Sequence, residues 1–187
     1  MMGHYGLLGQ KLGHSYSPAI HGLFGSVPYG LFEVQPEDLG EFLQSGQWDG
    51  LNVTIPYKKA AVNFCQELTP LAQRLGSVNT LTRRPDGTIC GDNTDYHGFL
   101  EMVRRINITC TGKKALVLGS GGASVTVQTV LRELGAEVIV ISRSGQDNYE
   151  NLTRHADAAI LVNATPVGIV DQIQDCFQMG ESIRSHR

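Results

Sequence analysis

A short apolar stretch that runs into a glycine-rich loop decides how this chain folds: Lys114-Ala115-Leu116-Val117-Leu118-Gly119-Ser120-Gly121-Gly122-Ala123. The apolar residues predict a strand, and the residues after the loop predict a helix that extends to Leu134. A glycine loop between a strand and a helix favours phosphate binding, because free N–H groups and the positive dipole end of the helix face the loop. Gly119 permits the tight turn, and Gly121 lets the backbone approach a pyrophosphate. Position 124 is Ser where the dinucleotide-binding pattern prefers Gly or Ala, so a turn used only for packing is the alternative.

The residues after this loop are typical of one βαβαβ half of a dinucleotide-binding fold. Strands are predicted at Glu137 to Ser142 and Ala158 to Asn163, with a short segment near Tyr149 to Thr153 between them. An NAD-specific site would place Asp or Glu at the end of the second strand, but this sequence has Ser142-Arg143-Ser144. A cation and two hydroxyls suit a 2′-phosphate, so the sequence favours NADP over NAD. A solvated surface arginine is the alternative.

The first hundred residues alternate short apolar stretches with helical ones, which is typical of α/β folds. A β-turn at Arg84-Pro85-Asp86-Gly87 predicts a hairpin between the last two strands. Ser17 is expected to cap the first helix, with Pro18 in its first turn. Helices are expected from Ser17 to Gly25, from Pro36 to Gly46 and from Thr94 to about Arg105. Strands are expected near Tyr5 to Gly9, Tyr29 to Gln35, Gly50 to Ile55, Val78 to Arg83 and Thr88 to Asp92.

The composition of the 187 residues limits the classes of function. A net charge of −3 with scattered Lys and Arg offers no basic surface to a nucleic-acid backbone. The apolar runs are far shorter than the roughly 20 residues of a membrane helix, and no signal peptide is recognisable, so a cytoplasmic protein without membrane contact is expected. Cys65, Cys90, Cys110 and Cys176 have no metal-binding spacing, so neither a metal site nor a disulfide is expected. The sequence leaves a homodimer open.

Polar residues at predicted strand ends are the candidates for chemistry. Lys58 is expected in the first turn of a helix that Pro56 starts, where the positive end of the helix dipole costs a cation about 0.3–1 kcal/mol. Such a position suits proton transfer. The alternative is that Lys58 and Lys59 both point into water, and Asp95 taken alone is explained as a helix N-cap or first-turn acid. Trp48 is expected to pack rather than to bind a ligand.

Six short motifs follow one another along the chain. They are Gly13-His14-Ser15-x-Ser17-Pro18-x-x-His21, Asn52-Val53-Thr54-x-Pro56-x-Lys58, Ser77-Val78-Asn79-Thr80, Gly91-x-Asn93-Thr94-Asp95-x-x-Gly98, Gly119-x-Gly121-Gly122-Ala123 and Asn163-Ala164-Thr165-Pro166-x-Gly168. Any single motif is weak, but six in order and at compatible spacing closely resemble the shikimate dehydrogenase family. The match covers residues about 5 to 169.

The resemblance implies an NADP-dependent oxidoreductase of the shikimate and chorismate pathway of aromatic amino-acid biosynthesis, which reversibly reduces 3-dehydroshikimate to shikimate. It implies an α/β fold in which residues 1–104 form a shikimate-binding catalytic domain. Residues 105–187 would form a partial Rossmann-type NADP-binding domain with a divergent tail from about residue 170. In the family, the pair that corresponds to Lys58 and Asp95 lies beside the reacting oxygen, with Lys58 favoured for proton transfer and Asp95 for orienting it.

The resemblance also implies which residues bind the two ligands. The Ser15-x-Ser17 pair is more similar to shikimate enzymes than to quinate-preferring relatives. The residues expected to hold substrate are Ser15, Ser17, Asn52, Thr54, Lys58, Asn79 and Asp95. Those expected to bind NADP are Gly119, Ser120, Gly121, Gly122, Ala123, Ser142, Arg143, Ser144, Asn163, Thr165 and Pro166.

The sequence departs from the family near Ile169. Family members continue with further strands of the cofactor sheet, a late Gln that contacts substrate and a terminal helix, so a C-terminally truncated chain is expected. By the strand order of a doubly wound sheet, Lys114 to Leu118 would then be an exposed edge, and turnover would be weak or absent. The alternatives are an inactive fragment that still binds shikimate, and another two-domain dehydrogenase of the quinate/shikimate or methylene-tetrahydrofolate type.

Overall fold

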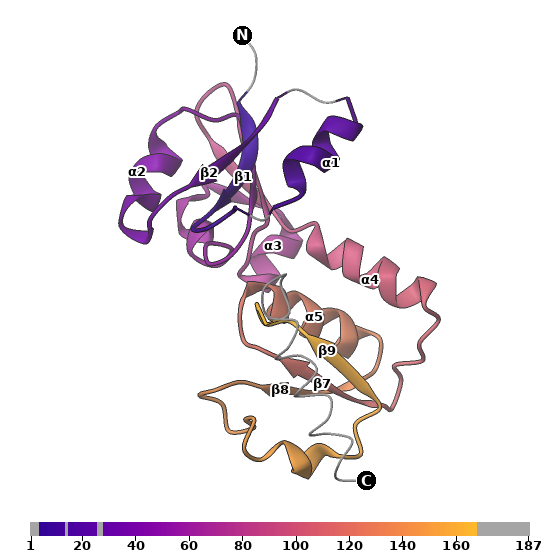
Figure 1. The fold of residues 1–187 in the computed structure, drawn as a ribbon. Coiled ribbons are helices and arrows are strands. Elements are labelled where there is room, and N and C mark those ends of the chain that lie inside the picture. The colour runs from indigo at the N-terminus through magenta and orange to yellow at the C-terminus, as the bar shows by residue number, and fades with distance from the viewer. Residues whose placement is uncertain (1–3, 14, 26–27, 168–187) are drawn as a thin grey trace. The chain divides into compact units, whose positions relative to one another are not determined.

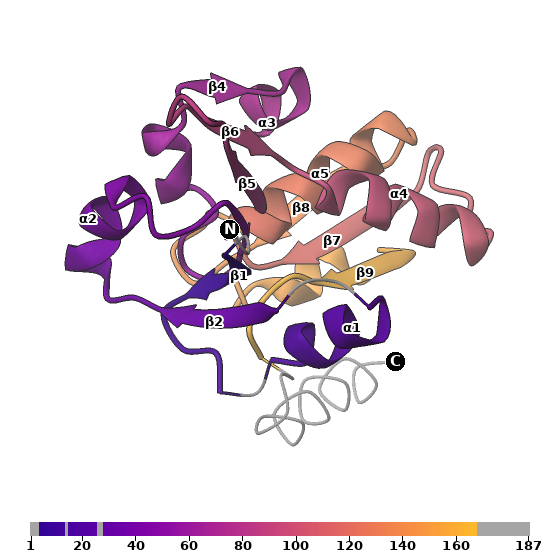
Figure 2. The same ribbon diagram turned by 90° about the horizontal axis from the view of Figure 1, so that it is seen from above.

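The computed structural model describes residues 4–13, 15–25 and 28–167 (Figures 1 and 2). The chain divides into two compact units, Met1–Asp95 and Tyr96–Arg187. Both units combine helices with a sheet, which confirms the expected α/β fold class. The domain limits 1–104 and 105–187 stay a prediction. In the described part of the chain, no helix is both long enough and apolar enough to cross a membrane.

The first unit is built on a six-stranded mixed sheet (Figure 1). Its strands are β1 (Tyr5–Gly9), β2 (Tyr29–Glu33), β3 (Gly50–Val53), β4 (Glu67–Leu68), β5 (Thr80–Arg83) and β6 (Ile89–Asp92). Its helices are α1 (Ser17–Leu23), α2 (Leu39–Gln44) and α3 (Pro70–Leu75), with 3-10 helices at Pro36–Asp38 and Ala60–Phe64. The strand order is β2-β1-β3-β5-β6-β4. β1, β2 and β3 are parallel, and β5 and β6 form the expected antiparallel hairpin, with Gly87 of its turn at φ 89°.

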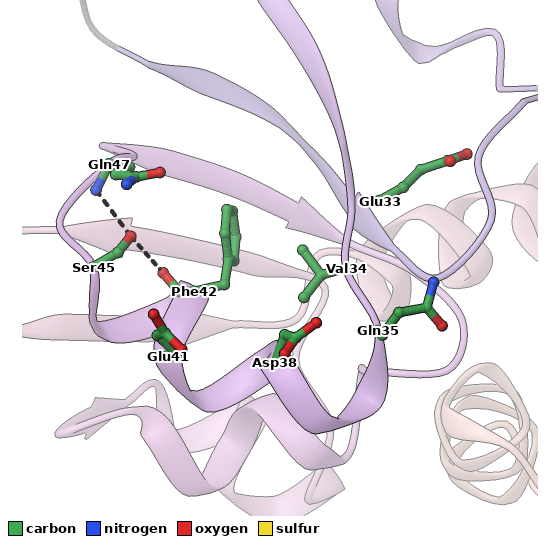
Figure 3. Close-up of a pocket in the computed structure, with 8 residues that line it drawn as sticks. All are labelled: Glu33, Val34, Gln35, Asp38, Glu41, Phe42, Ser45 and Gln47. Carbon is green, nitrogen blue, oxygen red and sulfur yellow. Dashed lines mark hydrogen bonds between the residues drawn. The ribbon is translucent and has the colours of Figure 1, made fainter.

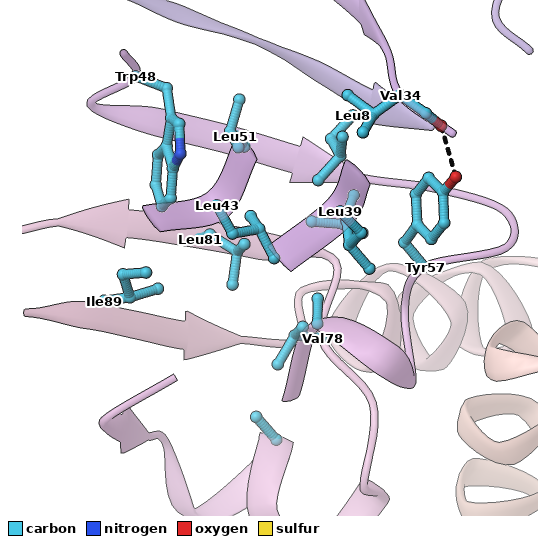
Figure 4. Packing of buried hydrophobic residues seen from close by; sticks show 13 residues of the cluster. Leu8, Val34, Leu39, Leu43, Trp48, Leu51, Tyr57, Val78, Leu81 and Ile89 are labelled. Atoms are coloured by element: carbon cyan, nitrogen blue, oxygen red, sulfur yellow. Dashed lines mark hydrogen bonds between the residues drawn. The ribbon is translucent and has the colours of Figure 1, made fainter. Parts of the chain in front are cut away.

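The hydrophobic core of this unit lies on one face of the sheet, where strand residues such as Leu8 and Leu81 meet Leu43 of α2 (Figure 4). Trp48 is fully buried in this core, so its expected packing role is confirmed. Side chains alternate between the two faces along a strand, so Tyr5, three residues before the core residue Leu8, faces away from the core. Tyr29 of β2 is the partner of Tyr5 and faces the same way. On that opposite face, helix α1 lies beside β2 (Figures 1 and 2), and His21 of α1 contacts the Tyr29 ring.

Two local expectations are wrong. Ser17 is not an N-cap but the first residue of α1, because the hydroxyl of Ser15 accepts the Ser17 N–H at 3.2 Å and closes a turn just before the helix. Pro56 does not start a helix: residues 55–59 form a turn that includes a cis Ile55–Pro56 peptide, ahead of the 3-10 helix. The Tyr57 N–H, for example, donates to the Thr54 carbonyl three residues back. The helix-dipole argument for Lys58 therefore does not apply.

The second unit holds a three-stranded parallel sheet. Its strands are β7 (Lys114–Leu118), β8 (Glu137–Ile141) and β9 (Ile160–Asn163). Its helices are α4 (Asp95–Arg105), whose first residue closes the first unit, α5 (Gly122–Glu133) and a 3-10 helix at Leu152–His155. Helix α5 runs across one face of the sheet and packs Val127 and Leu131 against Ala115 and Val117 of β7 (Figure 2). This is the expected partial Rossmann arrangement.

The strand order of this sheet is β8-β7-β9. β7 is therefore flanked on both sides, and the expectation that it forms an exposed edge is wrong. The reason is that β9 pairs with β7 rather than with β8, so the chain passes from one side of β7 to the other. Open α/β sheets bind ligands beyond the carboxyl ends of their strands at such a reversal of strand order.

Arg83 joins three parts of the first unit. Its guanidinium lies 4.4 Å from the centroid of the Trp48 ring, and it donates to the carbonyls of Leu43 in α2 and of Gly87 in the hairpin turn. Arg83→Met keeps the aliphatic stem and removes these interactions, so we expect the free energy of unfolding to fall by about 1–3 kcal/mol. Urea denaturation followed by the fluorescence of Trp48, the single tryptophan of the chain, measures this change.

Arg84→Met is the matched control. Arg84 is about as exposed as its partner Glu67, to which it is bound at 2.6 Å, and such surface pairs contribute little to stability. Equal losses of stability in the Arg83 and Arg84 variants would contradict the structural role given to Arg83.

Candidate active site

Lys58 and Asp95 form an ion pair in the first unit. Nζ of Lys58 lies 2.5 Å from Oδ2 of Asp95, and the two side chains are 16% and 35% exposed. Lys58 lies in the turn after β3, and its carbonyl accepts the Val78 N–H at 2.8 Å, which holds this turn against the segment that leads into β5. A partly exposed ammonium beside a carboxylate has a proton to give and a partner that stabilises its charge. The pair can therefore exchange a proton with an oxygen bound next to it.

Asn79 holds Asp95 in position. Its Nδ2 donates to Oδ1 of Asp95 at 2.8 Å and to Oγ1 of Thr94 at 2.9 Å. Its Oδ1 accepts the Thr94 N–H at 2.8 Å and the Thr80 hydroxyl at 3.0 Å. Asn79 is only 8% exposed, so losing any of these bonds would leave a buried polar group without its partner. Asp95, the first residue of α4, is thus a first-turn acid whose two oxygens are both engaged.

Asn52 lies on β3, and Thr54 follows the end of this strand. Asn52 is directly opposite Thr80 in the antiparallel pair of β3 and β5, so the two Cβ atoms are about 4.5–5.5 Å apart. Asn52 alternates with the core residues Leu51 and Val53 and therefore faces away from the core. Its Oδ1 accepts the Tyr29 hydroxyl at 2.7 Å. This places a fixed amide on the strand beside Thr80, which itself bonds the Asn79 side chain.

Ser15 and Ser17 follow β1 at the same edge of the sheet. Just after β1, the Gln10 N–H donates to the Ile55 carbonyl at 3.3 Å, so the loop after β1 and the turn after β3 are neighbours. Both serines are partly buried. In the described residues, no hydrogen bond joins either serine to Lys58. His14, in the same motif, lies outside the described residues.

In the second unit, the predicted cofactor residues follow the carboxyl ends of three adjacent strands. Leu118, the last residue of β7, is opposite Ile141 of β8 and Asn163 of β9. The Gly119 N–H donates to the Ile141 carbonyl at 2.8 Å, and the Ala164 N–H donates to the Leu118 carbonyl at 2.9 Å. The glycine loop 119–123, the segment 142–144 and the segment 163–166 therefore meet at one edge of the sheet, as the strand crossover requires.

The glycine loop is shaped by Gly119 and Ser124. Gly119 has φ 102°, and a Cβ at this position would lie 3.0 Å from the Ala164 carbonyl oxygen, so only glycine fits without strain. Ser124 is fully buried, and its hydroxyl donates to the Gly119 carbonyl at 2.6 Å while accepting from Gln128 at 3.0 Å. The serine that departs from the dinucleotide pattern thus braces the loop. A Cβ at Gly121 would meet nothing within 4 Å, so the loop is open at that point.

The other predicted cofactor residues differ in how far their polar groups are engaged. Arg143 is exposed, in a loop that the Ser142 N–H closes by donating to the Asp147 carbonyl at 3.2 Å. Asn163 accepts both the N–H and the hydroxyl of Thr165, at 3.0 and 2.6 Å, and donates to the Val167 carbonyl at 2.8 Å. Asn163 and Thr165 therefore form the turn after β9. Ser120, Ala123, Ser144 and Pro166 are exposed or partly exposed, and Gly122 lies in the first turn of α5.

A cavity of about 420 Å³ lies elsewhere in the first unit, near the end of β2 and along α2 (Figure 3). It contains none of the predicted site residues. Its charged lining residues are all carboxylates, namely Glu33, Asp38 and Glu41. Such a lining repels an anionic ligand, so this cavity is not the candidate active site.

Reasoning from the sequence assigned no role to Tyr29 or Thr94. Thr94 lies inside one of the motifs, but its bonds to Asn79 depend on how β5 meets the start of α4. For Tyr29, the sequence offered no signal, because alternation along β2 does not tell which of its faces carries Asn52, and only the pairing with β1 and β3 decides this.

The chain matches known proteins over most of its length. Residues 7–81 match the shikimate dehydrogenase substrate binding domain. The chain is 36% identical over 192 residues to the shikimate dehydrogenase (NADP(+)) of Clostridium beijerinckii, which covers 91% of this chain and 70% of that protein. It is 37% identical over 191 residues to the corresponding protein of Oleidesulfovibrio alaskensis, covering 91% and 67%.

Solved structures give the same result. Shikimate dehydrogenase 1 from Peptoclostridium difficile is 37% identical with a TM-score of 0.81, covering 89% of this chain and 68% of that one. Shikimate 5-dehydrogenase from Thermus thermophilus, solved in complex with NADP(H) and shikimate, is 36% identical with a TM-score of 0.76, covering 89% and 70%. This identity, sustained over at least two thirds of each of these relatives, shows that the chain belongs to the shikimate dehydrogenase family.

Proposed function

We propose that this chain catalyses the reversible, NADPH-dependent reduction of 3-dehydroshikimate to shikimate. The observation that carries the proposal is the Lys58–Asp95 ion pair, which Asn79 holds at the edge of the sheet in the first unit. The pair combines a proton donor with a group that orients it, as reduction of a carbonyl requires. The relatives named above, which are NADP(+)-dependent shikimate dehydrogenases, support this choice of reaction.

In this proposal Lys58 moves the proton. The cofactor supplies the hydride to the carbonyl carbon when it is bound, and the carbonyl oxygen must gain a proton as it becomes a hydroxyl. The Lys58 ammonium donates this proton, and in the oxidative direction the neutral amine takes it back from the hydroxyl. Asp95 orients Nζ through the 2.5 Å contact and stabilises the ammonium. Asn79 acts by keeping the Asp95 carboxylate in place.

Hydroxyl and amide groups around this pair suit a ring that carries hydroxyls and one carboxylate. Such a ligand offers many acceptor oxygens, and each leaves water only if a protein donor replaces the lost hydrogen bond. We assign the binding of these oxygens to Ser15, Ser17, Asn52, Thr54 and Asn79, in addition to Lys58 and Asp95.

The second unit has groups that fit a dinucleotide. Helix α5 has 12 residues and begins at Gly122, within the glycine-rich segment 119–123, so its unpaired N–H groups and positive dipole end face that segment. The open side of Gly121 leaves room for a phosphate. We assign the binding of the pyrophosphate to Gly119, Ser120, Gly121, Gly122 and Ala123. We assign the binding of the 2′-phosphate to Ser142, Arg143 and Ser144, and we propose that Asn163, Thr165 and Pro166 lie beside the cofactor.

A second candidate is shikimate binding without turnover. It is favoured by the fact that the Lys58–Asp95–Asn79 cluster and the residues assigned to substrate all belong to the first unit. NADPH formation from NADP and shikimate, followed by absorbance, tests the first proposal, with quinate and NAD as controls, and calorimetry measures binding. Shikimate-dependent NADPH formation supports the dehydrogenase. Binding without NADPH formation supports the second candidate. A protein that shows no binding of shikimate and no NADPH formation would contradict both candidates.

Lys58→Ala removes the proposed proton donor. We expect kcat to fall by about 10²–10⁴-fold, the usual contribution of a positioned acid or base, while the Kd for NADP stays unchanged. Steady-state kinetics and calorimetric titration with NADP measure the two quantities. Lys59→Ala, at the exposed neighbouring lysine, is the control and should retain activity. A Lys58→Ala enzyme with the activity of the Lys59→Ala control would remove Lys58 from the mechanism.

Arg143→Ala tests the assignment of the 2′-phosphate. A charge-assisted hydrogen bond to a phosphate is among the stronger ones, so we expect the Kd for NADP to rise by about tenfold or more with little change for NAD. Titration of both nucleotides measures the ratio. The control is Arg154→Ala, which removes an exposed arginine from the 3-10 helix of the same unit. An equal effect of both substitutions on NADP would show that Arg143 acts only through the general charge of the unit.

A further inference from the structure

We propose that Tyr29 is a positioning residue for substrate, whose hydroxyl fixes the Asn52 amide so that the Asn52 NH₂ group is presented to an oxygen of the substrate. The inference rests on the proposed function, because it assumes that a ring with several acceptor oxygens binds at this face of the first unit. Tyr29 itself need not touch the substrate. It acts through Asn52.

The geometry of the pair carries this inference. The Tyr29 hydroxyl donates to Oδ1 of Asn52 at 2.7 Å, across the width of β1. Within the described residues, the Tyr29 hydroxyl has no other hydrogen-bond acceptor and Nδ2 of Asn52 has no acceptor at all. Asn52 is only partly buried, so its free NH₂ group is within reach of a ligand. The amide oxygen of Asn52 is therefore hydrogen-bonded within the protein, and its NH₂ group remains available to a ligand.

The orientation of the amide follows from what each group can do. A carboxamide can turn over and exchange its oxygen and nitrogen with little change in shape. If Asn52 turned over, Nδ2 could donate to the Tyr29 oxygen, but the phenol proton would lose its acceptor. A partly buried hydroxyl without an acceptor is costly, so the observed orientation is favoured. Without the hydroxyl, the two orientations of Asn52 would be nearly equal, and only one of them offers a donor to the substrate.

Two further features keep Tyr29 in this role. The imidazole of His21 lies flat on the phenol ring, with centroids 3.8 Å apart and planes at 10°, which restricts the ring to one position. Burial raises the pKa of Tyr29 to about 12, so the hydroxyl keeps its proton at the pH of any ordinary assay. Tyr29 is thus a donor in a fixed position.

The location of Asn52 explains why its orientation would matter for this substrate. Asn52 is opposite Thr80, and the Thr80 hydroxyl donates to Asn79, which in turn bonds Asp95. The Asn52 amide is therefore next to Thr80, and Thr80 is hydrogen-bonded to the cluster that holds the proposed proton donor. A substrate ring whose reacting oxygen lies beside Lys58 would have its other oxygens within the reach of such neighbours.

Tyr29→Phe is the direct test, since it removes only the hydroxyl and keeps the ring that contacts His21. We expect the Kd and KM for shikimate to rise by at least about twofold, because only about half of the Asn52 amides would then present a donor, with kcat unchanged. Calorimetric titration with shikimate and steady-state kinetics measure these quantities. Tyr5→Phe is the matched control, because Tyr5 lies on the same face and its hydroxyl makes no hydrogen bond to a described residue.

A double-mutant cycle separates positioning from general damage. In an Asn52→Ala background, Tyr29→Phe should have no further effect on the Kd for shikimate, because its only route to the substrate is gone. An equal loss of affinity in both backgrounds would overturn the proposal, as would a Tyr29→Phe protein that binds shikimate like the wild type. Either result leaves the proposed dehydrogenase function intact. Wild-type protein that binds no shikimate would overturn the proposed function, and this inference with it.

Asn52→Asp provides a test that does not depend on how Tyr29→Phe folds. A carboxylate of nearly the same shape still accepts the Tyr29 hydroxyl, but it cannot donate to the substrate and it repels the substrate carboxylate. We expect the Kd for shikimate to rise by about tenfold or more. Wild-type affinity in Asn52→Asp would show that a donor at this position is not used.

Discussion

The hydrogen bonds of Asn79 are the constraint on which the site in the first unit depends. A carboxamide has two N–H donors and one carbonyl acceptor, and Asn79 uses all of them toward Thr80, Thr94 and Asp95. Its backbone also accepts the Val53 N–H at 2.7 Å and donates to the Asp92 carbonyl at 3.0 Å. One residue therefore connects β3, β5 and β6 to the first turn of α4. The position of the Asp95 carboxylate beside Lys58 is a consequence of the sheet register.

Short-range patterns in the sequence predicted most of the elements correctly. The strand expected at Lys114 to Leu118 is β7 residue for residue, and the turn at residues 84–87 forms the expected hairpin. The errors occur where the outcome depends on groups outside the local pattern. Ser15 occupies the Ser17 amide, which moves the start of α1, and the chain after Pro56 forms a turn and a 3-10 helix rather than an α-helix.

Contacts between distant residues could not be predicted from spacing. Lys58 and Asp95 are 37 positions apart, and the sequence indicated their pairing only through its resemblance to a family. Tyr29 and Asn52 are 23 positions apart, and no motif connects them. The order β8-β7-β9 has the same origin, because the alternation of strands and helices does not specify which neighbour the third strand chooses. In each case the outcome depends on which strands pair in a sheet and in which register they do so.

Helix α1 differs from the rest of the first unit in how it is held. It has seven residues, none of them buried, and Leu23 and the adjacent Phe24 are 88% and 78% exposed. Local opening of an element costs little when it buries few apolar contacts, so the amides of α1 should exchange with solvent much faster than those of β1 and β3. The fold thus combines an ion pair that the sheet holds in place with a short surface helix that contacts the sheet through His21 and Tyr29.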